Sequence, residues 1–380
     1  MVYLHKNWFR RWRSLRWLSL FWVACFSVMS LSLAPVKAQD GQADDLAFCV
    51  ANTLPLSESV LGRSYGDPHI NTYDGLYYSF QLVGEFMLTK AESSDFEVQT
   101  RQKAVSGSNG ISLNSAVAIQ VCGHRVAIYA QDVPNGGATK LWIDGIPMPV
   151  AADALPLPNG GEIQQVGSND YAVIWPSGDQ VLVRSIRAGG EDFLNIMPTL
   201  RASRQNGLTG LLGNFNGTVS DDLMSRDGSI VPAQSSYSLA TNTLDQALPA
   251  VIPVRDIENA YFDSLHRQFG DSWRIRQSES LFDYPTGQST ATFTDSAFPS
   301  EFVTLNGVAP ARVDAALTTC REAGVDEALL DGCVFDVAAT GESDFTNAAA
   351  NAIADAVVQE LTDRVLDEVL DNVPFPGLPF

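Results

Sequence analysis

The amino-acid sequence predicts a mainly β protein: an antiparallel β-sandwich followed by a small α-rich unit that carries a disulfide. Short runs of alternating apolar and polar residues extend from about Tyr65 to Leu200, and turns rich in Gly, Asn and Asp separate them. A parallel sheet would need helices between its strands, and this stretch has no helical pattern. Beyond it the apolar spacing becomes helical, and Cys320 and Cys333 stand close together.

The strands are expected where residues alternate with period two. The clearest runs are 86–89, 96–100, 117–121, 126–130 and 181–185. Turns are expected at 135–137, 144–145, 159–161 and 177–178, where Gly follows Asn, Asp or Ser. This density of short strands and turns is typical of a β-sandwich.

Two helices are expected after the strands. In residues 256–269 the apolar side chains fall four apart, at Ile257, Tyr261, Leu265 and Phe269. Residues 346–370 carry a second apolar stripe, with acidic residues mostly off it. That helix either docks on its own domain or binds a partner. The tail that follows holds three prolines and ends the helix.

Residues 1–38 are predicted to be a signal peptide. A positive segment with Lys6 and Arg16 precedes an apolar run, and Val-Lys-Ala at 36–38 offers a cleavage site before Gln39. A membrane anchor is the alternative; no later stretch is apolar and long enough to span a bilayer. The remaining chain divides into a lead-in at 39–61, a sandwich domain at 62–250, a small unit at 251–345 and a helix with a Pro-rich tail at 346–380.

The charge excludes nucleic acid as a partner. Residues 1–38 hold six Lys and Arg and no Asp or Glu, so their removal lowers the formal net charge from −20 to −26. Such a chain repels nucleic acid and anionic lipid. Its many carboxylates suit a hard cation such as Ca²⁺.

The cysteines indicate disulfides in an oxidising compartment. Four remain after residue 38, and four cysteines allow three pairings. Cys320–Cys333 is favoured because it closes a short local loop, which leaves Cys49–Cys122. No Cys or His spacing suggests zinc.

Two motifs resemble a known family. Gly-Asp-Pro-His at 66–69 is followed by Thr-Tyr-Asp-Gly at 72–75, and Gly-Leu-Thr-Gly-Leu-Leu-Gly-Asn-Phe-Asn-Gly at 207–217 is followed by Asp-Asp-Leu at 221–223. In this order, with strands between them, they resemble the opening and closing segments of von Willebrand factor type D domains. The resemblance covers roughly residues 62–250, about half of the chain.

The sequence departs from that family at its cysteines. Family members carry a cysteine pair at the positions of Phe86 and Leu212, and a further cysteine before Gly66. Two large apolar residues in place of the pair are what a lost buried disulfide should leave if packing replaces the cross-link. Disulfide-linked multimers are therefore not expected.

The closing motif is predicted to bind calcium. Asn214, Asn216, Asp221 and Asp222 place four oxygen donors within nine residues, and a backbone carbonyl near Thr218 adds to them. Calcium takes about six to eight oxygens from such mixed sets. The resemblance adds Asp74 as a ligand. The alternative is a metal-free turn of Asn, Asp and Gly.

The Asp67–Pro68 bond is a candidate for self-cleavage. Some D-domain proteins cleave themselves within Gly-Asp-Pro-His, and an Asp carboxyl can attack its own carbonyl when the next residue is proline. His69 would supply the proton, and mild acidification would break the bond. The alternative is that Asp67, Pro68 and His69 only build a turn and a strand.

No motif in the sequence indicates any other enzyme activity. His69, His124 and His266 are the histidines after residue 38, and none lies in a nucleophile or metalloprotease motif. A secreted hydrolase with a site in the C-terminal unit, using Asp283 and Asp295, is a further alternative. The leading expectation is a secreted or cell-surface structural or adhesive protein, with a periplasmic location as the variant. Its partner would be an extracellular protein or a glycan; the oligomeric state is left open.

Overall fold

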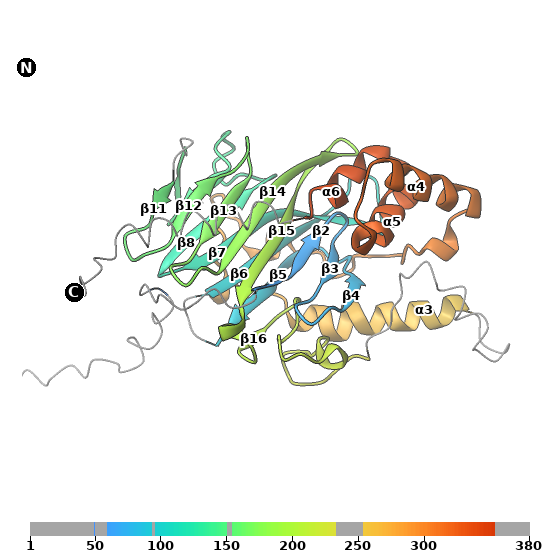
Figure 1. Ribbon diagram of the computed structural model, residues 1–380, viewed down its shortest axis with the longest axis horizontal. Helices are drawn as coiled ribbons and strands as arrows, with labels where there is room; N and C mark the ends of the chain where they lie inside the picture. Colours follow the sequence, from blue (N-terminus) through green and yellow to red (C-terminus); the bar gives the residue numbers. More distant parts are fainter. Residues whose placement is uncertain (1–48, 50–58, 93–95, 150–153, 233–253, 354–380) are drawn as a thin grey trace, which may run out of the picture. The chain divides into compact units, whose positions relative to one another are not determined.

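The computed structural model describes residue 49 and residues 59–92, 96–149, 154–232 and 254–353. The predicted signal peptide lies outside these residues. Every strand pair in them is antiparallel, which confirms the predicted fold class, and a helical region with a disulfide follows the strands (Figure 1). No helix in the described part of the chain has the length and apolar character needed to cross a bilayer.

The strands form two sheets. In the nine-stranded sheet the order is β11-β12-β13-β14-β15-β2-β3-β4, with β1 also on β15. Its strands are β1 (Ser59–Leu61), β2 (Arg63–Tyr65), β3 (His69–Asn71), β4 (Tyr77–Ser79), β11 (Leu155–Pro156), β12 (Glu162–Gln165), β13 (Tyr171–Ile174), β14 (Gln180–Ala188) and β15 (Glu191–Arg201).

The seven-stranded sheet has the order β10-β9-β8-β7-β6-β5-β16. Its strands are β5 (Gly84–Ala91), β6 (Phe96–Ala104), β7 (Ser112–Val121), β8 (His124–Tyr129), β9 (Leu141–Ile143), β10 (Ile146–Pro147) and β16 (Leu208–Thr209). Four of the five predicted runs lie within strands of the two sheets, and the run at 126–130 extends one residue past the end of β8. Alternating side chains place one apolar face of each strand toward the core.

The core lies between the sheets. Val117 and Ile119 of β7 and Val181 and Val183 of β14 are fully buried in it. Phe86 and Leu212, which stand where the resembled family has a cysteine pair, are also fully buried in this core. The interior is therefore packed with side chains at both positions.

The helices are α3 (Val254–Asp263), α4 (Pro310–Glu322), α5 (Leu330–Thr340) and α6 (Thr346–Ala350). A π-helical segment (Ser264–Gly270) continues α3, so the predicted helix at 256–269 is present, with Tyr261, Leu265 and Phe269 buried. The predicted continuous helix at 346–370 is wrong at its start, since α6 ends at Ala350 and residues 351–353 are not helical. Residues 354–380 lie outside the described part.

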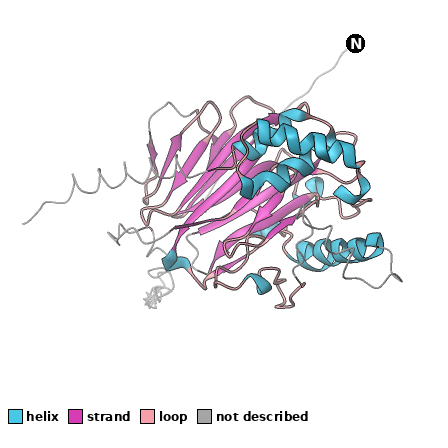
Figure 2. Cartoon of the chain, turned by 45° about the vertical axis from the view of Figure 1, so that its right-hand side comes forward, coloured by secondary structure: helices cyan, strands magenta, loops and turns pink. Residues whose placement is uncertain are grey.

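The region after the sandwich covers both outer faces. Phe282 packs against Ala116, Ala118 and Trp142 on the outside of the seven-stranded sheet. Helices α4 to α6, which we call the helical unit, pack on the outside of the nine-stranded sheet (Figures 1 and 2). Phe345 of this region stacks on Phe193 of β15. Positions that would face solvent in a bare sandwich are therefore buried.

Both predicted disulfides are present. Cys49 is bonded to Cys122 at the end of β7, and Cys320 of α4 is bonded to Cys333 of α5. The first bond ties the lead-in to the sandwich, and the second joins two helices of the helical unit.

Candidate functional site

The closing motif forms a loop anchored on the core. Leu211, Leu212 and Leu223 are fully buried on either side of it. Gly213 has a φ of 81°, and a Cβ there would lie 2.2 Å from Asp222 Oδ1, so only glycine fits this approach. The loop is thus held in one shape by its apolar flanks and its glycine.

Asp74 joins the opening motif to this loop. Its Oδ2 accepts a hydrogen bond from the Asn216 backbone N–H at 2.9 Å, and its Oδ1 accepts one from the Gly217 N–H at 2.9 Å. The structure therefore brings together residues that are 142 positions apart in the sequence. Asp74 orients the loop backbone with both of its carboxylate oxygens.

Three predicted ligands carry buried oxygens that accept no hydrogen bond from the described residues. These atoms are Asn214 Oδ1, Asp221 Oδ1 and Asp222 Oδ1. The other oxygen of Asp221 accepts a hydrogen bond from Asn216 Nδ2 at 2.9 Å, and that of Asp222 accepts one from the Thr72 hydroxyl at 2.6 Å. Buried oxygens without a donor are costly unless a cation or water satisfies them, so this donor set fits a hard cation.

The electrostatics of Asp222 agree with that fit. Burial raises the pKa of its carboxyl, and the nearby charges of Asp74 and Asp221 raise it further, to about 7, against the lowering effects of the Thr72 hydrogen bond and of the Asn214 backbone N–H. A bound cation would offset the repulsion among these carboxylates by supplying positive charge. Sequence reasoning quoted Thr72 within the opening motif but gave it no role.

Thr218 is placed differently from the other predicted ligands. It is exposed, its N–H donates to Asn216 Oδ1 at 2.7 Å, and its carbonyl accepts from the Asp221 N–H at 3.4 Å. Its contacts brace the loop turn that begins η2 (Val219–Asp221).

A second cluster surrounds the Asp67–Pro68 bond. The turn at residues 66–68 joins β2 to β3, and Tyr65 pairs with His69 across it. His69 Nε2 lies 2.8 Å from Asp67 Oδ1 and 2.6 Å from Asp336 Oδ1 of α5. All three side chains are fully buried. One imidazole nitrogen is thus shared by two carboxylates, one from each end of the chain.

The charges of this cluster are tightly linked. Burial lowers the pKa of His69, but the charges of Asp336 and Asp67 and the hydrogen bonds to them outweigh burial and raise it to about 10. Burial and the Asp336 charge raise the pKa of Asp67 well above its usual range, against the lowering effect of His69. His69 is therefore an imidazolium at neutral pH, a proton donor beside the Asp67–Pro68 bond.

Asp336 was missed by sequence reasoning. It is 267 residues from His69, and its only signal is an acidic residue among the buried side chains of α5. The close approach of α5 needs Gly66 and Gly332: a Cβ on Gly66 would lie 2.4 Å from Asp336 Oδ2, and one on Gly332 would lie 2.6 Å from the Tyr65 hydroxyl.

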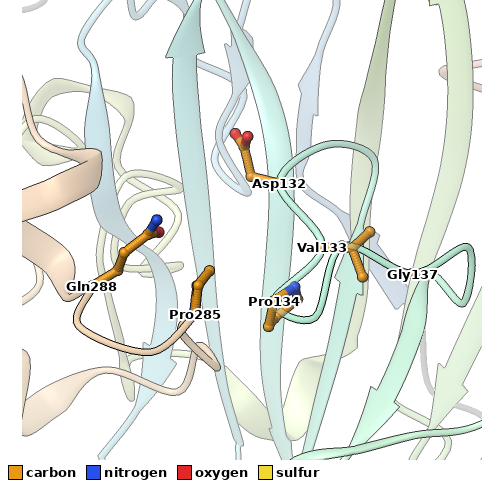
Figure 3. A pocket seen from close by; sticks show the side chains of 7 residues that line it. Asp132, Val133, Pro134, Gly137, Pro285 and Gln288 are labelled. Atoms are coloured by element: carbon orange, nitrogen blue, oxygen red, sulfur yellow. The ribbon is translucent and has the colours of Figure 1, made fainter.

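The carboxylates suggested for a hydrolase have structural contacts. Asp283 forms an ion pair with Arg125, and Asp295 Oδ1 accepts a hydrogen bond from the Ala297 N–H at 2.9 Å. Figure 3 shows a surface depression nearby, between the loop at 132–137 and Pro285 and Gln288. Its one acidic side chain, Asp132, pairs with Lys103 at 3.0 Å, so the depression offers no pair of acids.

Comparison with known proteins identifies the sandwich. Residues 62–229 match the von Willebrand factor type D domain family, a span that contains both motifs and Asp74. The sandwich is a von Willebrand factor type D domain. Residues 283–361 match the C-terminal domain of repulsive guidance molecules, a span that includes the helical unit and Asp336.

Two of three similar proteins match a longer stretch of this chain than the type D domain alone. Human sushi domain-containing protein 2 is 26% identical over 294 residues, which cover 74% of this chain and 31% of that protein. Protein mesh of Bombyx mori is 25% identical over 284 residues, 67% of this chain and 15% of that protein. SCO-spondin of Rattus norvegicus is 29% identical over 174 residues, 45% of this chain and 3% of that protein. The chain thus spans a minor part of the length of each relative.

Proposed function

We propose that this chain is an exported, extracellular structural protein whose type D domain binds one calcium ion. In this proposal the ion joins the opening and closing motifs and rigidifies the domain, which presents its loops to an extracellular protein or a glycan. The likeness to SCO-spondin, zonadhesin and protein mesh, which are not named as enzymes, supports a structural role. The acidic composition and the two disulfides agree with an exported protein.

The observation that carries the calcium proposal is the set of buried oxygens in the closing loop. Asn214, Asp221 and Asp222 each hold one oxygen without a donor among the described residues. Bound calcium would supply positive charge to these oxygens. Among the described residues, the only group of three or more acidic, His or Cys side chains with ligand atoms within 4.8 Å of one another is Asp67, His69 and Asp336. The calcium site would therefore need amide oxygens as well as carboxylates.

Thermal unfolding of the chain from Gln39 to Phe380 tests this proposal. We expect millimolar calcium to raise the midpoint by several degrees relative to chelator, because a ligand that binds only the folded state stabilises it. The Asn216→Ala plus Asp222→Ala variant should lose that rise. The Asn135→Ala plus Asp192→Ala variant, which makes the same changes at exposed positions outside the loop, should keep it. Equal midpoints with calcium and with chelator in the unsubstituted chain would refute calcium binding.

We also propose a second function, self-cleavage at Asp67–Pro68. The observation that favours it is the buried His69 ring, whose Nε2 lies 2.8 Å from Asp67 Oδ1 and 2.6 Å from Asp336 Oδ1. A turn needs no such group, and burying a histidine between two aspartates is expensive unless the arrangement serves chemistry. The Asp67 side chain is the nucleophile in this proposal, and His69 donates the proton to the leaving nitrogen of Pro68.

Mass spectrometry of the purified chain between about pH 5 and pH 9 tests self-cleavage. After reduction of the disulfides, we expect a fragment that begins at Pro68, and we expect its loss in the His69→Ala variant. The His124→Ala variant serves as the control, because His124 is near the surface and pairs with Asp144. An unsubstituted chain that stays intact at every pH would rule self-cleavage out.

A further inference from the structure

We propose that two residues outside the Gly-Asp-Pro-His motif, Gln81 and Asp336, complete the centre that cleaves the Asp67–Pro68 bond. Gln81 is the catalytic donor that stabilises negative charge on the carbonyl of Asp67. Asp336 is a positioning residue that holds His69 from the helical unit. This inference rests on the proposed self-cleavage and assigns parts of that site that neither motif contains.

Gln81 contacts the carbonyl that self-cleavage would attack. Its Nε2 donates to the Asp67 backbone oxygen at 3.0 Å, and its side chain is buried. The orientation of the amide is determined by its other end, where Oε1 accepts from the backbone N–H of Ser112 at 2.8 Å. A flipped amide would place two donors against each other at Ser112, so the NH₂ group must face Asp67.

Gln81 is also fixed through its backbone. Its N–H donates to His266 Nε2 at 3.1 Å, and burial together with the charges of Arg267 and Arg274 lowers the pKa of His266 to about 3. His266 therefore stays neutral and keeps a lone pair for this bond. A donor that is held in place before the reaction stabilises the developing negative charge more than water does, because water must reorient as the charge develops.

Asp336 holds the proton donor. Its Oδ1 is 2.6 Å from His69 Nε2, slightly closer than Asp67 Oδ1 at 2.8 Å. When the Asp67 carboxylate moves to its own carbonyl carbon, it gives up this contact, and Asp336 remains to fix the ring. Phe335 of the same helix packs edge-on against His69 at a centroid distance of 5.7 Å. The helical unit thus supports the imidazolium on two sides.

The step balances with water as the one co-reactant. A carboxylate oxygen of Asp67 bonds to the Asp67 carbonyl carbon, and the bond from that carbon to the Pro68 nitrogen breaks. The nitrogen takes the proton from His69 and leaves as a secondary amine. Water then opens the cyclic anhydride of Asp67 and leaves two carboxyl groups on the new C-terminus. Gln81 stabilises the oxyanion that forms between attack and departure.

The other titratable groups that face His69 stay neutral. They are the hydroxyls of Tyr65 in β2 and Tyr77 in β4, and the Tyr77 ring stacks on His69 at 5.8 Å. Burial raises the pKa of both hydroxyls above the usual range. Changes in the pH profile of cleavage between about pH 5 and pH 9 would therefore report on Asp67 and His69.

The experiment compares two variants with matched controls in the chain from Gln39 to Phe380. Synthesis in an oxidising cell-free system shows the intact chain before it cleaves, and mass spectrometry of samples reduced after quenching gives the rate. We expect Gln81→Glu to slow cleavage by about 10² to 10³-fold, because it removes the donor and keeps the acceptor for Ser112. Gln102→Glu makes the same change at a buried site elsewhere in the sandwich and should cleave at the unsubstituted rate.

Asp336→Asn should move the pH profile. Loss of its charge lowers the pKa of both His69 and Asp67, so both limbs of the profile should shift to lower pH, and Asp336→Glu should restore them. Asp344→Asn is the control, since Asp344 also belongs to the helical unit and accepts from the Gly189 N–H of the sandwich at 3.1 Å. It should leave the profile unchanged.

The outcomes separate this inference from the proposal beneath it. An unsubstituted chain that never cleaves defeats self-cleavage and, with it, any role for Gln81 and Asp336. A chain that cleaves, with unchanged rate in Gln81→Glu and an unmoved profile in Asp336→Asn, overturns this inference alone. Thermal melts check that each variant is folded. If Gln81→Glu does not fold, Gln81→Met is used in its place, because its side chain is similar in length and has no donor. Gln81→Met must then show the same slow cleavage.

Discussion

Buried charged side chains of this protein are held by specific partners. Arg101 is 1% exposed, and its Nη2 lies 2.7 Å from Glu85 Oε1, while its guanidinium lies 3.7 Å from the centre of the Phe293 ring. Arg204 and Asp179 form a second buried pair at 2.8 Å. Removing one member of such a pair leaves the other charge buried without a partner. Substitutions at these residues should therefore lower the free energy of unfolding far more than substitutions of surface charges.

We expect Arg101→Met to lower the free energy of unfolding by about 3 to 5 kcal/mol, because it leaves Glu85 buried without its cation. Urea unfolding measures this change. The control is Arg187→Met, which breaks the exposed pair with Asp192 and should cost less than about 1 kcal/mol. Similar losses in the two variants would show that Arg101 and Glu85 form no buried pair.

Calcium affinity should weaken as the pH falls through about 7. The pKa of Asp222 is raised to about 7 in the metal-free protein from an ordinary value of 3.8, so the folded metal-free protein binds this proton more tightly than the unfolded chain does. Asp222 therefore destabilises the metal-free fold progressively as the pH rises from about 4 to about 7. Calcium competes with the same proton.

Calorimetric titration at pH 6 and pH 8 measures this dependence. Below the pKa, one competing proton should weaken calcium binding by up to about tenfold per pH unit. Asp222→Asn, which has no proton to displace, should bind weakly at both values with little difference between them. Equal affinity of the unsubstituted chain at both values would contradict a role for Asp222 as a ligand.

At the scale of elements, α5 is central to the helical unit. It bonds to α4 through Cys320–Cys333, it packs on the nine-stranded sheet, and it carries Asp336 to the Asp67–Pro68 turn. Asn195 of β15 donates to the Ala348 carbonyl of α6 at 2.7 Å and adds a polar contact to this docking. A change that loosens α5 should therefore lower the local stability of the helical unit more than that of the strands.

The Cys320→Ala plus Cys333→Ala variant tests this difference. Closing a loop of this length stabilises a protein by about 3 kcal/mol, through loss of freedom in the unfolded chain. We expect faster hydrogen exchange in α4 and α5 and little change in β6 and β7. Uniform loss of protection in helices and strands would instead indicate that the two parts unfold as one unit.

At the scale of the whole molecule, the Asp67–Pro68 bond lies inside a disulfide-closed loop. Cys49 precedes the bond, and its partner Cys122 follows it. Strands β1 and β2 also precede the bond, and they pair with β15 and β3 on its far side. Cleavage would therefore leave both fragments within one fold.

We expect a cleaved chain to run as one species without reductant and as two species with it. Electrophoresis and mass spectrometry distinguish these states, and a Cys49→Ala plus Cys122→Ala variant should lose the covalent link. Because β1 and β2 remain paired, the fragments of that variant should still elute together in gel filtration under native conditions. Separation of the fragments without reductant in the unsubstituted chain would contradict the Cys49–Cys122 bond.

Much of this protein followed from local sequence patterns. The period-two runs predicted strands because neighbouring side chains of a strand point to opposite faces. The Gly-rich closing motif predicted the loop that gathers Asn214, Asp221 and Asp222, since its donors are close in sequence. The four cysteines after residue 38 likewise predicted two disulfides, and both favoured pairs are present.

Other features depended on contacts between distant segments. Sequence periodicity cannot reveal that Phe282 and the helical unit cover the outer faces of the sheets, and the stripe at 346–370 gave no sign that α6 ends at Ala350. Asp336 and Gln81 reach the Asp67–Pro68 turn because α5 docks on the sandwich and Ser112 orients the amide. Local patterns report the conformation of a segment, whereas which buried charge meets which partner is decided by packing across the whole chain.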